Sequence, residues 1–143
     1  MPVTVQILPD YNLVYVRFWG VLRVEETAAA LAAFARNPQC RPGQRHLVDL
    51  TRLTDIERNY PKLMELEASK VEMLAGTGIE TFMVYLANTP IGRRATNMGR
   101  NGWPPECGVV AIGLENEDDA LFALGLPFRS IADMLAHSTA INT

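Results

Sequence analysis

A group of polar residues ends or follows the aliphatic run 45–51, near the middle of the chain. Carboxylate, hydroxyl and guanidinium groups gathered in one place suit the recognition of a phosphate or a carboxylate. Ligands of α/β proteins bind at the carboxyl ends of strands, so the group predicts a small polar recognition site. Its members are Asp49, Thr51, Arg52 and Thr54, with Arg58 as a nearby charge partner.

The same residues also fit ordinary turn chemistry. Asp and Thr side chains commonly bond backbone N–H groups after a strand. Thr54 and Glu57, three residues later, have the spacing of a helix capping box. In this alternative the group is structural, and Asp49 holds backbone donors.

A second cluster lies in the segment 89–106, where Arg93, Arg94 and Arg100 accompany a predicted helix start and Trp103 follows them. The free N–H groups of a helix N-terminus favour an anion. Cations beside an aromatic side chain suit a small anionic or lipid-like ligand with an apolar tail. The alternative is a solvated helix face on which Trp103 packs as a lid.

Motifs for catalysis do not stand out. The chain has no Gly-x-Ser-x-Gly elbow, no phosphate-binding Gly-Lys-Ser/Thr and no dinucleotide glycine fingerprint. His46 and His137 have no metal-ligand spacing to each other or to Cys40 and Cys107. We therefore expect no enzyme, no cofactor and no metal, although scattered groups such as Asp49 and His46 can still converge in space.

Composition points to one globular domain. The 143 residues are 48% hydrophobic and 20% charged, with a net charge of −3. A slightly acidic chain offers no bulk positive field for nucleic acid, and its longest apolar runs are shorter than a membrane span. With no secretory signal evident at the start, we expect a cytoplasmic protein.

Hydrophobic periodicity predicts strands alternating with helices. Strands are expected at 3–8, 13–19, 45–51, 80–87 and 107–114, and helices at 24–36, 61–75, 89–102, 116–124 and about 127–137. The order β-β-α-β-α-β-α-β-α predicts an α/β fold with a mixed sheet of about five strands and helices packed on it. In the second strand, Val14, Val16 and Phe18 alternate with the opposite face and are expected in the core.

This pattern resembles the STAS domain, the SpoIIAA-like fold of sporulation anti-sigma-factor antagonists, including members described as STAS-like or SEC14-like. The residues that carry the resemblance are 13–20, 24–34, Leu47-Val48-Asp49-Leu50-Thr51 and Asp118-Asp119-Ala120-Leu121. It spans a core of about 3–126 within a single domain of 1–143. The resemblance implies the fold and a non-enzymatic regulatory role.

Phosphoregulated STAS domains carry a phosphoacceptor Ser in an Asp-Ser-Ser-Gly-like motif after the Asp-ended strand. This chain has Leu53-Thr54-Asp55-Ile56-Glu57 there, without Ser or Gly. Thr54 is the substitute phosphoacceptor that the resemblance suggests, and Thr51 is the second.

Two surfaces are candidates for a homodimer or a protein partner. Tyr15, Arg17 and Trp19 line the second face of a strand, and aromatic and Arg side chains are typical interface anchors. On a wheel of the helix 61–75, Leu66 and Met73 share the outer face. The inner stripe is expected to be Leu63, Met64, Ala68, Val71, Leu74 and Ala75. Either surface can instead be covered by the chain's own elements.

The sequence thus favours a regulatory module that binds a protein partner or itself through the segment 49–60 and the following helix. The alternative is a carrier or sensor of a small amphipathic anionic or lipid-like ligand, held between that helix and the segment 93–103. A carrier should show an apolar pocket with Arg93 or Arg94 at its mouth.

Overall fold

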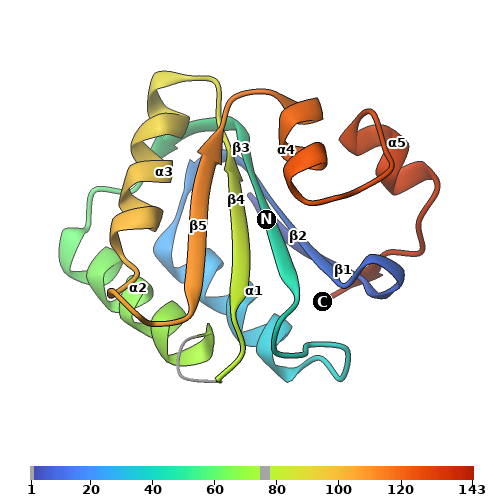
Figure 1. Cartoon of the computed structure of the whole chain (residues 1–143). Coiled ribbons are helices and arrows are strands. Elements are labelled where there is room, and N and C mark those ends of the chain that lie inside the picture. Colours follow the sequence, from blue (N-terminus) through green and yellow to red (C-terminus); the bar gives the residue numbers. More distant parts are fainter. Residues whose placement is uncertain (1, 75–77) are drawn as a thin grey trace.

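The computed structural model describes residues 2–74 and 78–143. These residues fold into a mixed six-stranded sheet with helices on both faces (Figure 1). The strands are β1 (Val3–Leu8), β2 (Leu13–Leu22), β3 (Arg45–Ile56), β4 (Thr81–Leu86), β5 (Val109–Leu114) and β6 (Ile141–Asn142). The helices are α1 (Val24–Arg36), α2 (Tyr60–Leu74), α3 (Pro90–Asn101), α4 (Glu117–Ala123) and α5 (Ile131–Ala136), with a short 3-10 helix at Pro9–Tyr11.

The strand order is β5-β4-β3-β2-β1-β6. β2 to β5 pair in parallel, whereas β1 is antiparallel to both β2 and β6. The predicted α/β class, the mixed sheet and the element order are confirmed. The short C-terminal strand β6 was not predicted, because its two residues carry no periodicity.

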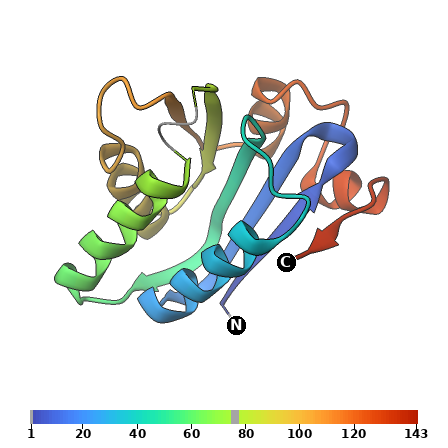
Figure 2. The same ribbon diagram turned by 90° about the horizontal axis from the view of Figure 1, so that it is seen from below.

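Two hydrophobic cores lie on opposite faces of the sheet. One is covered by α1, α2 and α3, and the other by α4 and α5 (Figure 2). Alternation along β2 divides its side chains between them: Val14, Val16 and Phe18 face the first core as predicted, while Leu13 and Tyr15 are buried in the second.

β3 is five residues longer than the predicted strand and takes in most of the expected loop. It runs beside the long strand β2, where two register shifts keep the pair in step as far as Leu22 and Ile56. Thr54 is therefore an exposed strand residue rather than a helix cap, so the capping-box prediction is wrong. Glu57 instead accepts a hydrogen bond from the Val24 N–H at 2.7 Å, at the start of α1.

Two other helix starts follow local sequence signals. The Thr89 side chain accepts from the Gly92 N–H at 3.0 Å and caps α3, as predicted. The Asn59 side chain accepts from the Lys62 N–H at 3.3 Å, next to the start of α2. Ala75, the predicted end of that helix, lies outside the described residues. Within the described ranges, no helix has the length and apolar character to cross a bilayer.

Candidate functional site

A small apolar chamber of about 50 Å³ lies between the first face of the sheet and the helices above it. Its floor includes Val14 of β2 and Val48 of β3, and its roof includes Leu31 of α1 and Met73 of α2. Trp103, just after α3, forms part of one side. At the chamber, Lys70 and Met73 of the second helix and Trp103 of the segment 93–103 border the same space.

His46 stands out on the floor of this chamber. The residue is 5% exposed, and its ring meets that of Phe34 edge-on with 6.0 Å between centroids. Burial lowers the pKa of His46 to about 4, so the imidazole is neutral near pH 7. The His46 ring makes no hydrogen bond to another described residue, and its nitrogens are not among the fully buried polar atoms that lack a partner.

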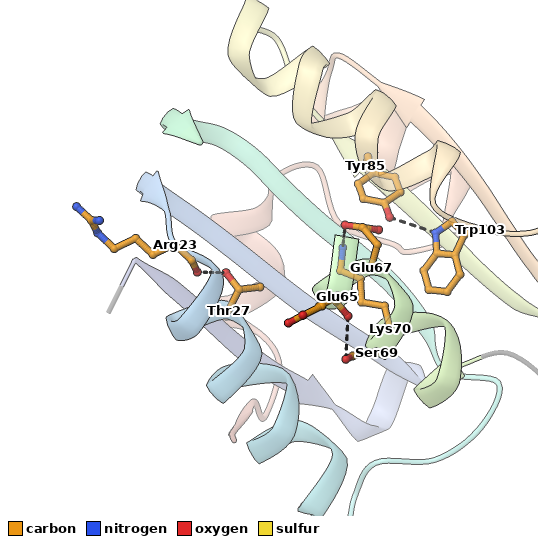
Figure 3. A network of polar contacts seen from close by, with 8 residues as sticks. All are labelled: Arg23, Thr27, Glu65, Glu67, Ser69, Lys70, Tyr85 and Trp103. Atoms are coloured by element: carbon orange, nitrogen blue, oxygen red, sulfur yellow. Dashed lines mark hydrogen bonds and ion pairs between the residues drawn. The ribbon is translucent and has the colours of Figure 1, made fainter. Parts of the chain in front are cut away.

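The remaining polar groups at the chamber already have partners (Figure 3). Lys70 and Glu67 of α2 form an ion pair at 3.0 Å with side chains only 21% and 11% exposed. The Trp103 Nε1–H donates to the Tyr85 hydroxyl at 3.4 Å, and the Thr27 hydroxyl donates to the Arg23 carbonyl at 2.8 Å. Burial also raises the pKa of Tyr85, which keeps its hydroxyl neutral.

A glycine faces the end of the Glu67 side chain. A Cβ added at Gly102 would lie 2.5 Å from the Glu67 Oε2 atom, closer than side chains pack. Gly102 thus makes room beside Trp103 for a carboxylate on the inner face of α2.

An open apolar groove of about 380 Å³ runs on the outside, between α1 and α2. The small side chains Ala28, Ala32 and Ala35 of α1 line one side of it. Leu31 and Met73 border both the groove and the chamber, so these two side chains form the partition between them.

On the opposite face of the sheet, a polar cleft of about 610 Å³ lies between β2–β3 and the residues of α4 and α5. The Tyr15 hydroxyl donates to Asp49 Oδ2 at 2.7 Å. The N–H and hydroxyl of Thr51 donate to Asp49 Oδ1 at 3.0 and 2.7 Å. Burial and the neighbouring carboxylate raise the pKa of Tyr15 well above its usual range, so this phenol stays a neutral donor.

The cleft carries both signs of charge. Arg17 and Arg52 line one part, and the Arg17 guanidinium lies 5.3 Å from the centre of the Trp19 ring. Glu115 and Glu117 line another part, but Glu115 pairs with Arg93 at 3.2 Å and Glu117 accepts from the Ile131 N–H at 2.6 Å. Their carboxylates serve the fold rather than an open site.

The structure brings together part of the first predicted site. Asp49, Thr51 and Arg52 share the cleft, whereas Thr54 and Arg58 are exposed and do not line it. The extension of β3 carries Thr54 away from Asp49, because five extended residues span about 17 Å.

The second predicted site is divided. Trp103 borders the chamber, but Arg93 and Arg94 lie on the exposed side of α3, where Arg93 pairs with Glu115 and Arg94 donates to the Tyr60 hydroxyl at 3.4 Å. The inner side of α3 consists of the small residues Gly92, Ala95, Thr96 and Gly99. The expectation of Arg93 or Arg94 at the mouth of an apolar pocket is therefore wrong.

The predicted faces of α2 are also corrected. Leu66 is buried, Met73 is half-buried over the chamber, and Met64 is 70% exposed. Glu67 and Lys70, which the predicted inner stripe did not include, are largely buried and pair with each other. On β2, Tyr15 is buried under α4 and α5, and Arg17 and Trp19 are half-buried.

Two residues of the chamber escaped the sequence analysis as site residues. The position of His46 could have served as a signal, because this ionisable residue is followed directly by the apolar residues Leu47 and Val48 in a predicted strand. Lys70 gave no signal, since a Lys three residues after a Glu on a helix is typical of a solvated face.

Comparison with solved structures identifies a protein of similar fold. No protein-family model and no curated protein match the chain. The crystal structure of an uncharacterised DUF3478-family protein from Shewanella loihica PV-4, described as having a SpoIIAA-like fold, aligns with 78% of this chain and 83% of its own. The TM-score is 0.51 at 16% sequence identity.

The chain has a SpoIIAA-like fold. The resemblance drawn from the sequence is thus confirmed for the architecture, and identity at this level establishes the fold alone. In this SpoIIAA-like fold, the connection 57–59 between β3 and α2 holds no hydroxyl side chain. Thr54 is solvent-exposed but lies on β3 rather than at a helix start.

Proposed function

We propose that this chain is a non-enzymatic module that carries or senses a small amphipathic molecule in the chamber beneath α1 and α2. The observation that carries the proposal is the ring of His46, 5% exposed, which borders an apolar space without a hydrogen-bond partner among the described residues. Buried polar groups are nearly always hydrogen-bonded. A bound molecule with one polar group would pair with this ring, as water also would in a space of this size.

The proposal does not include catalysis, because Asp49, the buried carboxylate of the polar cleft, is already hydrogen-bonded within the fold. Asp49 accepts three hydrogen bonds from Tyr15 and Thr51. Both oxygens of this carboxylate are thus occupied by donors from within the fold. The neighbouring hydroxyls donate to it and are not paired with a histidine base.

Binding of a protein partner or of a second copy of the chain is the second candidate function. The surface proposed for it is the outer side of α2 around Tyr60 and Met64, rather than Leu66 and Met73. Tyr60 and Met64 on the outer side of α2 are 59% and 70% exposed. The same helix contributes Lys70 and Met73 to the chamber. Because α2 takes part in both surfaces, a ligand bound in the chamber would change the affinity of a partner that docks on Tyr60 and Met64. This is how a sensor works.

Native mass spectrometry followed by denaturing mass spectrometry on the same gently purified sample tests the proposal. We expect an added mass that is lost on denaturation, and a protein stripped of it should bind 1-hexanol with a change in Trp103 fluorescence. A protein that has the sequence mass and does not respond to 1-hexanol would overturn the proposal. An added mass of one phosphate that survives denaturation would instead point to a phosphoswitch.

A further inference from the structure

The charges around the chamber decide what kind of molecule it can accept. Lys70 is the one permanently charged side chain among the described residues that line it, and Glu67 neutralises Lys70 at 3.0 Å. Arg93, Arg94 and Arg100, the cations of α3, are exposed and do not line the chamber, although Arg100 acts electrostatically on the Tyr85 hydroxyl. An ionised head group would find no unpaired counter-charge among the residues that line this apolar space, at a large desolvation cost.

His46 offers hydrogen bonds instead of charge. A neutral imidazole has one N–H donor and one ring-nitrogen acceptor. The ring packs edge-on against Phe34 of α1 and the residue is 5% exposed, so bulk solvent has little access to it. A hydroxyl group complements it well, because a hydroxyl both donates and accepts, and a carbonyl can accept from the N–H.

The size of the chamber limits what fits within it. A single water needs about 10–15 Å³ by this kind of measure, and a cavity of about 150 Å³ is known to hold benzene. At about 50 Å³ the chamber therefore has room for a head group and the first carbons only. A longer chain must continue elsewhere.

The groove between α1 and α2 provides the continuation. It measures about 380 Å³, is lined mainly by apolar side chains, and meets the chamber at Leu31 and Met73. Met side chains are unbranched and flexible, so rotation of Met73 is the simplest way to join the two spaces. Ala28, Ala32 and Ala35 leave room for an alkyl chain along α1.

We infer that the ligand is an uncharged amphiphile with a hydroxyl or carbonyl head group bound to His46 and an alkyl tail that passes Met73 into the groove between α1 and α2. This inference rests on the proposed function and narrows it from the anionic ligand first expected to a neutral one. It also assigns His46 as the head-group contact and Met73 as the movable partition.

Head groups of one chain length provide the test. The Trp19→Phe variant leaves Trp103 as the single tryptophan of the chain, so its fluorescence reports on the chamber. We expect 1-hexanol to bind at least about tenfold more tightly than hexanoate or hexylammonium at pH 7, from the cost of burying an unpaired charge. Isothermal titration of the unsubstituted protein serves as a check on the same three probes.

The outcomes separate the inference from the proposed function. Tighter binding of hexanoate, lost in Lys70→Met, would overturn the neutral ligand while keeping the chamber as the site. Equal affinity for all three probes would place the head group outside the chamber and would also overturn the inference. If none of the three probes binds, both the inference and the proposed function are overturned.

Variants of the two assigned residues complete the test. His46→Gln keeps a donor and an acceptor and should retain 1-hexanol binding, whereas His46→Leu should lose about tenfold in affinity, the worth of one hydrogen bond at the upper end of its usual range. Met73→Ala should speed association, and the matched change Met64→Ala on the exposed side of α2 should not. Unchanged affinity in His46→Leu, with the fold intact by circular dichroism, would contradict the assignment.

Discussion

Glu57, directly after β3, accepts a hydrogen bond of 2.7 Å from the backbone N–H of Val24, the first residue of α1. The residue before the helix, Arg23, supplies no side-chain cap. The start of α1 thus depends on a carboxylate 33 residues later in the chain. Since α1 forms part of the chamber roof, this bond helps to position Leu31 and Phe34.

Glu57→Ala should destabilise the protein by about 1 kcal/mol, because it removes both a cap and a negative charge at a helix N-terminus. Urea denaturation followed by circular dichroism measures the effect. Glu72→Ala, on the exposed side of α2, is the matched control and should change stability little. Equal stability of the two variants would show that the bond does not hold α1 in place.

Tyr15→Phe should destabilise the protein by about 1–3 kcal/mol, because it leaves a buried Asp49 oxygen without its 2.7 Å donor. Tyr60→Phe is the control, since the Tyr60 side chain is 59% exposed. Both are measured by urea denaturation at pH 7. A loss in Tyr15→Phe no larger than in the control would mean that water replaces the donor at no cost.

Acid should destabilise the fold through His46. Its pKa is about 4 in the folded protein against 6.5 when exposed, so the unfolded chain binds a proton that the folded protein does not. Stability should therefore fall as the pH is lowered from 6.5 to 4, by a contribution of about 3 kcal/mol in total. Phe34, Lys70 and Tyr85 also line the chamber, and none provides a negative charge that would stabilise the protonated ring.

The measurement is the difference in unfolding free energy between wild type and His46→Gln over that pH range. His46→Gln has no group that titrates there, so the difference should shrink or reverse on acidification. A difference that stays constant from pH 7 to pH 4.5 would show that the ring is accessible to protons in the folded state.

Self-association, if it occurs, should use the exposed side of α2. Met64→Glu places a charge at a side chain that is 70% exposed and should convert a dimer to a monomer in sedimentation or light scattering. Leu66→Glu is not a valid probe, since Leu66 is buried in the core and its substitution would unfold the chain. A dimer that persists in Met64→Glu would exclude this face.

Much of the architecture could be predicted from the sequence because apolar periodicity reports directly on strands and helices that cover a sheet. The end of β3 could not, since Arg52, Thr54 and Asp55 are polar, while Arg52 and Asp55 pair with the end of β2 and Thr54 falls at a register shift between them. Tertiary pairing overrides local preference there.

The site was harder to predict than the fold, for a physical reason. The inner face of α2 contains Glu67 and Lys70, which a hydrophobic wheel assigns to solvent. Their ion pair and the space left by Gly102 exist only in three dimensions. His46 belongs to an apolar strand, and nothing local shows that its ring lacks a partner.

The most direct test of the account is an NMR measurement of intermolecular contacts between 1-hexanol and the protein labelled with carbon-13 and nitrogen-15. The account predicts nuclear Overhauser contacts from the first carbons of 1-hexanol to the His46 ring and the Val48 methyls, and from its tail to Met73 and Ala32. Contacts confined to the exposed side chains of Tyr60 and Met64, with the His46 signals unmoved, would contradict it.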